Sequence, residues 1–355
     1  MAAKEPLVIT DKDQMRNWSR AMRSQGKAIG FVPTMGYLHQ GHLSLIREAH
    51  EHADLIVVSI YINPGQFSPT EDLSTYPSDF DGDIQKLMAF PGGVDVVFHP
   101  HNLYDYGINS VMNNYQKLQL GNQRSQSQVL NPGLPHKTNS KNCNVKEEEN
   151  GAVSCEEEKG IGHETWVRVE KLEKGLCGKS RPIFFRGVAT IVTKLFNIVE
   201  PDIAMFGKKD YQQWRIIQRM YNRLQEESKK HAWEGPRSRF IYKVIGSEVV
   251  RDDDGLAMSS RNVHLSREER KKALSINRSL LRAKSAAEKG EIDCGKLRDL
   301  VIQAVNEAGG RIDYAEQIVD QESLEAVEQI NAPVVFCLAA WFGKVRLIDN
   351  MEIDG

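Results

Sequence analysis

The sequence has almost no surplus of charge of either sign. Among its 355 residues, 46 lysines and arginines stand against 48 aspartates and glutamates, so the formal net charge is −2. A dedicated nucleic-acid binder would carry a basic surplus to neutralise phosphates, and we expect no such partner here. No apolar run approaches the roughly 18 residues that a membrane span needs, and the first residues lack the apolar core of a secretory signal. These absences predict a cytosolic protein without membrane contact.

Closely spaced cysteine pairs are also missing. The sequence contains five cysteines, and no two of them form a C-x-x-C pair. We therefore expect free thiols in a reducing compartment, with neither a zinc site nor a redox pair. A chain of 355 residues exceeds the size at which a single core usually stops growing, which predicts two domains.

The first part of the chain alternates apolar runs with helical periodicity. Residues 28–32, 54–62 and 94–98 are predicted strands, and residues 43–52 and 81–88 are predicted helices. Strands that alternate with helices usually form a parallel sheet flanked by helices. The pattern predicts an α/β fold with a Rossmann-like, nucleotide-binding sheet.

The alternation stops at about residue 106 and resumes at about residue 165. Residues 106–164 are rich in Asn, Gln, Ser, Lys and Glu, with few apolar side chains to offset the entropy cost of ordering. We interpret them as a long, mobile insertion in the first domain. Beyond it, helices at 187–199 and 211–224 and strands at 203–206 and 240–245 continue the same sheet.

The last third has a different character. Ser266 and Glu269 form a capping box, which predicts the start of a long polar helix because each side chain satisfies a free amide. We expect a first domain over 1–249 and a smaller α+β domain over 250–355, with a hairpin turn at Gly343. The other predicted elements of the smaller domain are a helix at 296–308 and strands at 313–319, 334–341 and 345–348.

The first motif with chemical meaning is PTMGYLHQGH at residues 33–42, between a predicted strand and a predicted helix. Gly36 and Gly41 allow tight turns and close approach of a ligand, and the helix start offers free amides to a triphosphate. His39 and His42 add donors for phosphate oxygens, and we expect an imidazolium to stabilise the phosphate charge. An H-x-x-H pair alone is equally typical of an exposed loop or a metal site; the strand-loop-helix setting favours a nucleotide.

Three further segments carry polar groups suited to the same ligand. In GLAMSSRN at 255–262, two hydroxyls precede Arg261, whose guanidinium can bind phosphate in a bidentate way. In FGKKDYQQ at 206–213, Lys209 is a candidate phosphate partner, Asp210 a candidate for ATP or magnesium, and Gln213 a candidate for a substrate hydroxyl or amide. NPGQF, which begins at Asn63, presents neutral amides that suit a hydroxy acid. Each segment alone is typical of a surface turn or helix cap.

Taken together, these segments resemble the pantothenate synthetase (pantoate–β-alanine ligase) family over nearly the whole chain apart from the insertion. The matching stretches are FVPTMGYLHQGHLSLIREA, VVSIYINPGQF, EDLSTYP, FRGVATIVTKLFNIVEPDIAMFGKKDYQQ, DGLAMSSRN and RLIDN. The insertion looks most like that of plant members. The resemblance implies a homodimer and a fold of the H-x-G-H nucleotidyltransferase type. It also implies two steps: pantoate attacks the α-phosphate of Mg-ATP to give pantoyl adenylate and pyrophosphate, and β-alanine then displaces AMP.

The resemblance also implies roles for single residues. The implied catalytic residues are His42, His39, Lys209 and Arg261, with His42 in the place of the family's active histidine. The implied ATP-binding residues are Met35, Gly36, Tyr37, Leu38, His39, Gln40, Gly41, His42, Gly207, Lys208, Lys209, Asp210, Val250, Met258, Ser259, Ser260 and Arg261. The residues implied for pantoate and β-alanine are Asn63, Gln66, Arg181 and Gln213.

Three positions depart from the family pattern. Lys208 replaces the usual glutamate of Gly-Glu-Lys-Asp, which predicts a modestly altered ATP affinity because the local charge changes by two units. Phe184 replaces a frequent histidine close to Arg181. The magnesium ligand is less well defined: Asp81 and Asp83 are both candidates, and we expect Asp83 to hold the Mg²⁺ that accompanies ATP.

Two other functions are compatible with these residues. One is another nucleotidyl-transferring enzyme of the same architecture, although the neutral Gln66 and Gln213 suit a small hydroxy acid better than a second phosphate-rich substrate. The other is a non-catalytic regulator that uses the charged insertion to bind partners, which the intact set of histidine, lysine, serine and arginine residues disfavours. The motifs themselves do not specify the amine.

Overall fold

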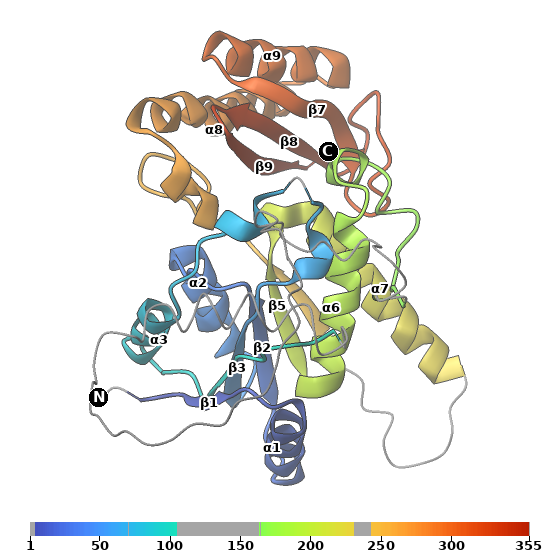
Figure 1. Cartoon of the computed structure of the whole chain (residues 1–355). Helices are drawn as coiled ribbons and strands as arrows, with labels where there is room; N and C mark the ends of the chain where they lie inside the picture. Colours follow the sequence, from blue (N-terminus) through green and yellow to red (C-terminus); the bar gives the residue numbers. More distant parts are fainter. Residues whose placement is uncertain (1–3, 70, 105–162, 164, 231–242, 355) are drawn as a thin grey trace, which may run out of the picture.

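The computed structural model describes residues 4–69, 71–104, 163, 165–230 and 243–354 (Figure 1). The predicted insertion at 106–164 lies outside the described residues apart from His163, as does the first half of the strand predicted at 240–245. Within the described part, the chain forms a six-stranded sheet and a three-stranded sheet. Figure 1 shows the smaller sheet above one end of the larger sheet.

The six-stranded sheet is parallel throughout, as the β-α alternation predicts. The strands lie in the order β1-β4-β3-β2-β5-β6, so the direction of winding reverses between β2 and β5. In open α/β sheets, ligands bind at such a reversal, beyond the carboxyl ends of the strands. The strands are β1 (Leu7–Ile9), β2 (Ile29–Thr34), β3 (Leu55–Ile60), β4 (Val96–Phe98), β5 (Ile203–Gly207) and β6 (Lys243–Ser247).

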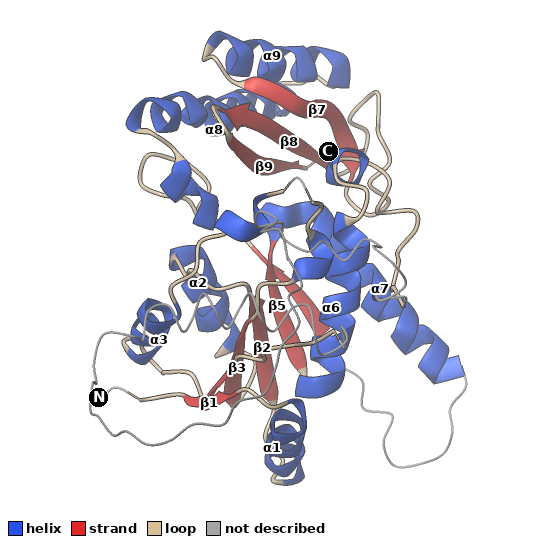
Figure 2. Cartoon of the chain, viewed as in Figure 1, coloured by secondary structure: helices blue, strands red, loops and turns tan. Residues whose placement is uncertain are grey.

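Helices cover both faces of this sheet (Figure 2). Because successive strand residues point to opposite faces, Phe31 and Val57 pack in the core with one group of helices, and Val32 and Val58 pack with the other. The first group is α1 (Lys12–Ser24), α6 (Phe184–Val199) and α7 (Tyr211–Lys230); the second is α2 (Gln40–Ala49) and α3 (Phe80–Met88).

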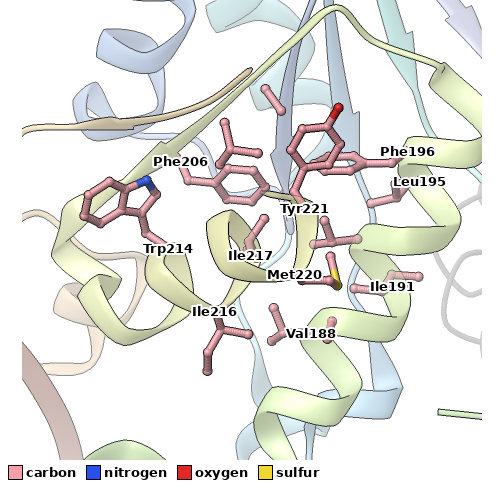
Figure 3. Packing of buried hydrophobic residues seen from close by; sticks show 14 of the residues in the cluster. Val188, Ile191, Leu195, Phe196, Phe206, Trp214, Ile216, Ile217, Met220 and Tyr221 are labelled. Carbon is pink, nitrogen blue, oxygen red and sulfur yellow. The ribbon is translucent and has the colours of Figure 1, made fainter. Parts of the chain in front are cut away.

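The packing of α6 on α7 fixes the position of the strand end at β5 (Figure 3). Val188, Ile191 and Leu195 of α6 are buried against α7 residues such as Met220, and each such side chain contributes roughly 1.5–3 kcal/mol when fully buried. Phe206 of β5 lies edge-on to Phe196 of α6, with ring centroids 6.3 Å apart. The sequence predicted this apolar face of α6, and the structure confirms it.

The three-stranded sheet is antiparallel, and α8 (Arg267–Glu288) and α9 (Cys294–Glu307) cover one of its faces. Phe336 and Leu338 of the middle strand face these helices, whereas Val335 and Cys337 join the core of the larger sheet. The middle strand therefore contributes side chains to the cores of both sheets. The strands are β7 (Arg311–Asp320), β8 (Val334–Phe342) and β9 (Val345–Ile353), in the order β7-β8-β9.

Local signals in the sequence account for most of these boundaries. The capping box at Ser266 and Glu269 is present at the start of α8, and Gly343 turns the β8–β9 hairpin with φ +59°. The sequence did not predict β1 or α1, because β1 has only three residues and α1 is mostly polar, burying only Met15 and Ser19. The predicted division at 249/250 follows β6, and its independence as a folding boundary stays a prediction.

Candidate active site

A cavity of about 850 Å³ lies at the carboxyl ends of β2, β3 and β5 and extends to β8 and β9. Ligand sites in proteins usually measure about 300–1,000 Å³. The cavity contains most of the residues that the sequence pointed to, although they come from segments far apart in the chain. They are Met35, His39, Gly41, His42, Asn63, Gln66, Arg181, Gly207, Lys209, Asp210, Gln213, Val250, Met258, Ser259, Ser260 and Arg261.

Seven residues named from the sequence do not line this cavity: Gly36, Tyr37, Leu38, Gln40, Lys208, Asp81 and Asp83. Gly36 and Leu38 are buried within the loop between β2 and α2, and Gln40 is exposed on α2. Gly36, Tyr37 and Leu38 shape the loop through their backbone, with Gly36 and Tyr37 in the left-handed region at φ +83° and +53°. Their contribution is to the conformation of the histidine loop.

The carboxylate of Asp83 stabilises the histidine loop through hydrogen bonds. This carboxylate is fully buried, and its two oxygens accept hydrogen bonds from the backbone amides of Tyr37 and Leu38, each at 2.7 Å. Lys86 lies 3.5 Å from the same carboxylate. Because both oxygens accept loop amides and Asp83 does not line the cavity, the structure does not support the expected role of Asp83 as a magnesium ligand, which stays a prediction. Asp81, the other candidate, is exposed on α3.

The two histidines have defined proton positions. The backbone amide of Gly41 donates to Nδ1 of His39 at 3.1 Å, and the backbone amide of His39 donates to Nδ1 of His42 at 3.3 Å. Because each Nδ1 is an acceptor, each neutral ring carries its proton on Nε2. The rings lie side by side, with centroids 4.1 Å apart. The start of α2 thus presents two neighbouring N–H donors.

Both imidazoles are neutral near pH 7. Burial lowers the pKa of His39 to about 4, with a further contribution from the positive charge of Lys209. The pKa of His42 is also well below its usual value, because of burial and then of His39, Lys209 and Lys86. The lowered pKa values do not support the expected imidazolium in the free protein: positive charge in this part of the cavity comes from Lys209, and the neutral histidines present N–H donors.

Lys208 and Lys209 point in different directions from η3 (Lys208–Asp210). Lys209 lines the cavity, with its ammonium 3.4 Å from the carboxylate of Asp210. Lys208 donates to Glu248 at 2.6 Å and to Glu352 of β9 at 2.9 Å. Lys208 therefore connects the two sheets, and its expected contact with ATP is not supported.

The neutral amides form a connected group after β3. Asn63 is 1% exposed; its Nδ2 donates to the side-chain oxygen of Gln66 at 2.9 Å, and its Oδ1 accepts from Tyr104 at 2.8 Å. Gln66 is thereby oriented at the cavity wall, in η1 (Pro64–Gln66). A β-carbon on Gly187 would lie 2.1 Å from the carbonyl oxygen of Gly65, so glycine allows α6 to approach this turn.

The sequence did not predict the contribution of the smaller sheet to the cavity wall. Tyr314, Cys337, Trp341 and Arg346 all line it. Arg346 is held by Asp313, at 2.9 Å from Nε to the carboxylate, and it reaches back to Ser180 in α5 (Cys177–Ser180) at 3.3 Å. No local motif marks these strand residues, because their pattern is that of any buried β-strand.

The acidic partners of the two cavity arginines were also missed. Arg181 pairs with Glu71, and Arg261 pairs with Asp72. These carboxylates belong to the stretch EDLSTYP, which contributed to the resemblance without an assigned chemical role. A signal was present in the form of two adjacent acids followed by a tyrosine, but their partners lie 110 and 189 residues away.

Fold and site together define a nucleotidyl-transferring enzyme of the H-x-G-H type: a parallel sheet with its histidine loop at the switch point, faced by the Ser-Ser-Arg segment in η4 (Ser260–His264). Comparison with known proteins gives the family. The model for pantoate-beta-alanine ligase matches residues 7–352, and the chain belongs to this family of ligases.

Relatives and solved structures agree with this assignment. The chain is 64% identical to the pantoate–beta-alanine ligase of Lotus japonicus, over 98% of this chain and 99% of that protein. A crystal structure of pantothenate synthetase from Thermus thermophilus matches with a TM-score of 0.73 at 32% identity, over 98% and 99% of the two chains. A pantoate-beta-alanine ligase from Francisella tularensis, complexed with beta-gamma ATP and beta-alanine, matches with a TM-score of 0.63 at 27% identity, over 98% and 97%.

Proposed function

We propose that the protein joins pantoate to β-alanine at the expense of ATP, through a pantoyl-adenylate intermediate. The observation that carries this function is the meeting of two kinds of group in one cavity. Phosphate-binding donors from His39, His42, Lys209 and Arg261 line the same space as the neutral amide of Gln66. A triphosphate and a small hydroxy acid would therefore be held side by side, as carboxylate attack on a phosphate requires.

In the first step, a pantoate oxygen attacks the α-phosphate and pyrophosphate leaves. The Nε2–H groups of His39 and His42 would donate to phosphate oxygens as negative charge develops, while Lys209 and Arg261 supply positive charge. A donor fixed by the backbone amides needs no reorganisation during the reaction. The mixed anhydride then has AMP as a leaving group, and the amine of β-alanine displaces it. The protein's task is positioning and electrostatic stabilisation.

Magnesium is proposed to enter with ATP, because Mg²⁺ commonly binds through substrate phosphates and only one or two carboxylates. Among the described residues, no group of three or more His, Cys, Asp or Glu side chains could form a protein-only metal site. Glu71, Asp72 and Asp349 pair with arginines, whereas the closest charged partner of Asp210 is Lys209 at 3.4 Å. Asp210 would therefore be the protein contact, and the ion would reduce the repulsion between phosphates and the incoming carboxylate.

The bound pantoate would lie along Asn63, Gln66 and Gln213, with Arg181 close to the carboxylate of one of the two acids. We further propose a homodimer in the cytosol, on the basis of the family resemblance. None of the helices in the described part is long and apolar enough to cross a bilayer. Sedimentation equilibrium would test the dimer, since a single species at the monomer mass would contradict it, and fractionation of cells would test the location.

The experiment that tests the function is product identification with all three substrates and with each one omitted. We expect AMP, pyrophosphate and pantothenate in equal amounts, and pyrophosphate release that needs pantoate but no amine. ADP and inorganic phosphate as products would instead indicate an acyl phosphate. Release of pyrophosphate only with an added nucleotide acceptor would favour another nucleotidyl-transferring enzyme. ATP binding without any turnover would favour the non-catalytic regulator.

A further inference from the structure

A short acidic segment contacts both arginines of the cavity. Glu71 directly precedes η2 (Asp72–Thr75) and pairs with Arg181. Asp72 begins the same helix and pairs with Arg261. One turn of chain therefore pairs with two guanidiniums that come from distant parts of the sequence, the end of α5 and the Ser-Ser-Arg segment.

The pair between Asp72 and Arg261 has a restrictive geometry. Nε of Arg261 donates to Oδ2 at 2.8 Å, and Nη2 donates to Oδ1 at 3.0 Å. Such a side-on, two-oxygen pair fixes the plane of the guanidinium. A guanidinium has five N–H donors, so the Nη1 edge remains available for a phosphate in an orientation that Asp72 sets.

Aromatic rings complete the support on both sides. The ring of Tyr76, at the end of the same segment, lies 5.5 Å from the guanidinium of Arg261. The ring of Phe184 lies 3.8 Å from the guanidinium of Arg181, so the phenylalanine that departs from the family pattern stacks on this arginine. Glu71 is itself fixed, because its second oxygen accepts from the backbone amide of Ser68 at 2.7 Å.

These pairs are more shielded than ordinary surface pairs. The side chains of Arg181 and Glu71 are 13% and 22% exposed, and those of Arg261 and Asp72 are 28% and 36% exposed. All four residues line the cavity. Burial alone would lower the pKa of Arg261, but the hydrogen bond and charge of Asp72 raise it. The guanidinium is therefore held charged and in one orientation.

We propose that Glu71 and Asp72 are positioning residues for adenylate formation: Asp72 orients Arg261 toward the reacting phosphates, and Glu71 orients Arg181 toward the carboxylate of one of the two acids. This inference rests on the proposed function. The opposite possibility is that the carboxylates only compete with the triphosphate for the arginines. The two possibilities predict different effects of removing the carboxylate. Loss of a competitor would not slow the chemical step once ATP is bound, whereas loss of a positioning group would slow it.

The test is a double-mutant cycle between Asp72→Asn and Arg261→Met, read from the single-turnover burst of pyrophosphate with saturating Mg-ATP and pantoate. The burst amplitude counts competent sites, so the rate reports chemistry even if part of the sample is misfolded. We expect Asp72→Asn to lower the burst rate about tenfold without raising the KM for ATP, and to have little further effect when Arg261 is already methionine. Asp72→Glu should restore part of the rate.

The matched control is Glu200→Gln, which removes a carboxylate at the end of α6 that pairs with Arg20 of α1 outside the cavity, and its burst should equal that of the wild type. An unchanged rate in Asp72→Asn, or equal losses in both Arg261 backgrounds, would overturn the proposal. If wild-type protein gives no burst with pantoate, the proposed function fails instead. The same cycle measured by calorimetric binding of Mg-ATP then decides the positioning role: tighter binding in Asp72→Asn that disappears when Arg261 is methionine would show that the carboxylate only competes with the triphosphate, and would contradict it.

Discussion

The two halves of the site are held in different ways. The histidine loop of the larger sheet is fixed by backbone hydrogen bonds and by one buried carboxylate, Asp83, and its imidazoles are neutral. The opposite wall consists of charged groups, Arg261 and Arg346, each oriented by a carboxylate across the cavity or along the sheet. A neutral donor needs only a rigid backbone, whereas a cation needs an anionic partner to stay oriented in a shielded cavity.

The largest effect on the reaction rate should come from a change in the histidine loop. His42→Ala removes a preorganised donor, and we expect the rate of pantoate-dependent pyrophosphate release to fall about 10²–10³-fold, the usual loss for one such donor. Stopped assays with saturating substrates measure it. His52→Ala, in a loop outside the cavity, is the control; equal rates in His42→Ala and wild type would remove the histidine loop from the mechanism.

Loss of Asp83 should act on stability as well as on binding. Asp83→Asn leaves at least one buried amide without a good acceptor, which costs about 1–3 kcal/mol, and it loosens the loop that presents the histidines. Urea unfolding measures the first effect and the KM for ATP the second. Unchanged stability combined with a greater requirement for Mg²⁺ would restore Asp83 as a magnesium ligand.

The charged connection between the sheets should give a smaller effect. Lys208→Glu places a third carboxylate beside Glu248 and Glu352, and we expect a loss of about 1 kcal/mol in the free energy of unfolding at low salt, because such pairs are partly exposed. Salt should reduce the loss. Lys208→Met removes the ion pairs without adding a negative charge, so it separates the loss of these pairs from the repulsion between carboxylates. A changed affinity for ATP at equal stability would support the original expectation that Lys208 contacts the nucleotide.

The pH dependence should show the smallest but most specific effect. An unfolded histidine titrates near 6.5, whereas His39 titrates at about 4. Between these values the unfolded chain binds a proton that the folded chain does not, so this contribution to stability is complete above pH 6.5 and is lost as pH falls toward 4. Nitrogen chemical shifts, assigned with His39→Gln, should show the Nε2–H tautomer throughout pH 5–8. A titration near 6.5 would contradict the neutral donor.

The sequence was most informative where structure is local. Apolar periodicity located α6 and α7, and the capping box located the start of α8, because these signals depend on neighbouring residues. The loop motifs also identified most of the cavity lining. The protonation state of the histidines could not be deduced in this way, because it depends on burial beneath other segments. The partner of Arg261 is 189 residues away, and nothing in a local motif specifies that pairing.

The same limit explains why the expected roles of Asp83 and Lys208 are not supported. Asp83 follows a helix start rich in acids, where a metal ligand and an acceptor of loop amides look identical in sequence. Lys208 and Lys209 are neighbours of the same type, and only the tertiary structure shows that one enters the cavity while the other reaches Glu352 of the smaller sheet.

The central claim is that both halves of the cavity act in the same chemical step. Rapid-quench measurement of adenylate formation in wild type, His42→Gln and Arg261→Met, with Mg-ATP and pantoate but no amine, tests it most directly. We predict one equivalent of pyrophosphate per site in wild type and a much slower burst in both variants. A burst of wild-type rate in Arg261→Met would show that the charged wall opposite the histidine loop takes no part in the first step, and would contradict the account.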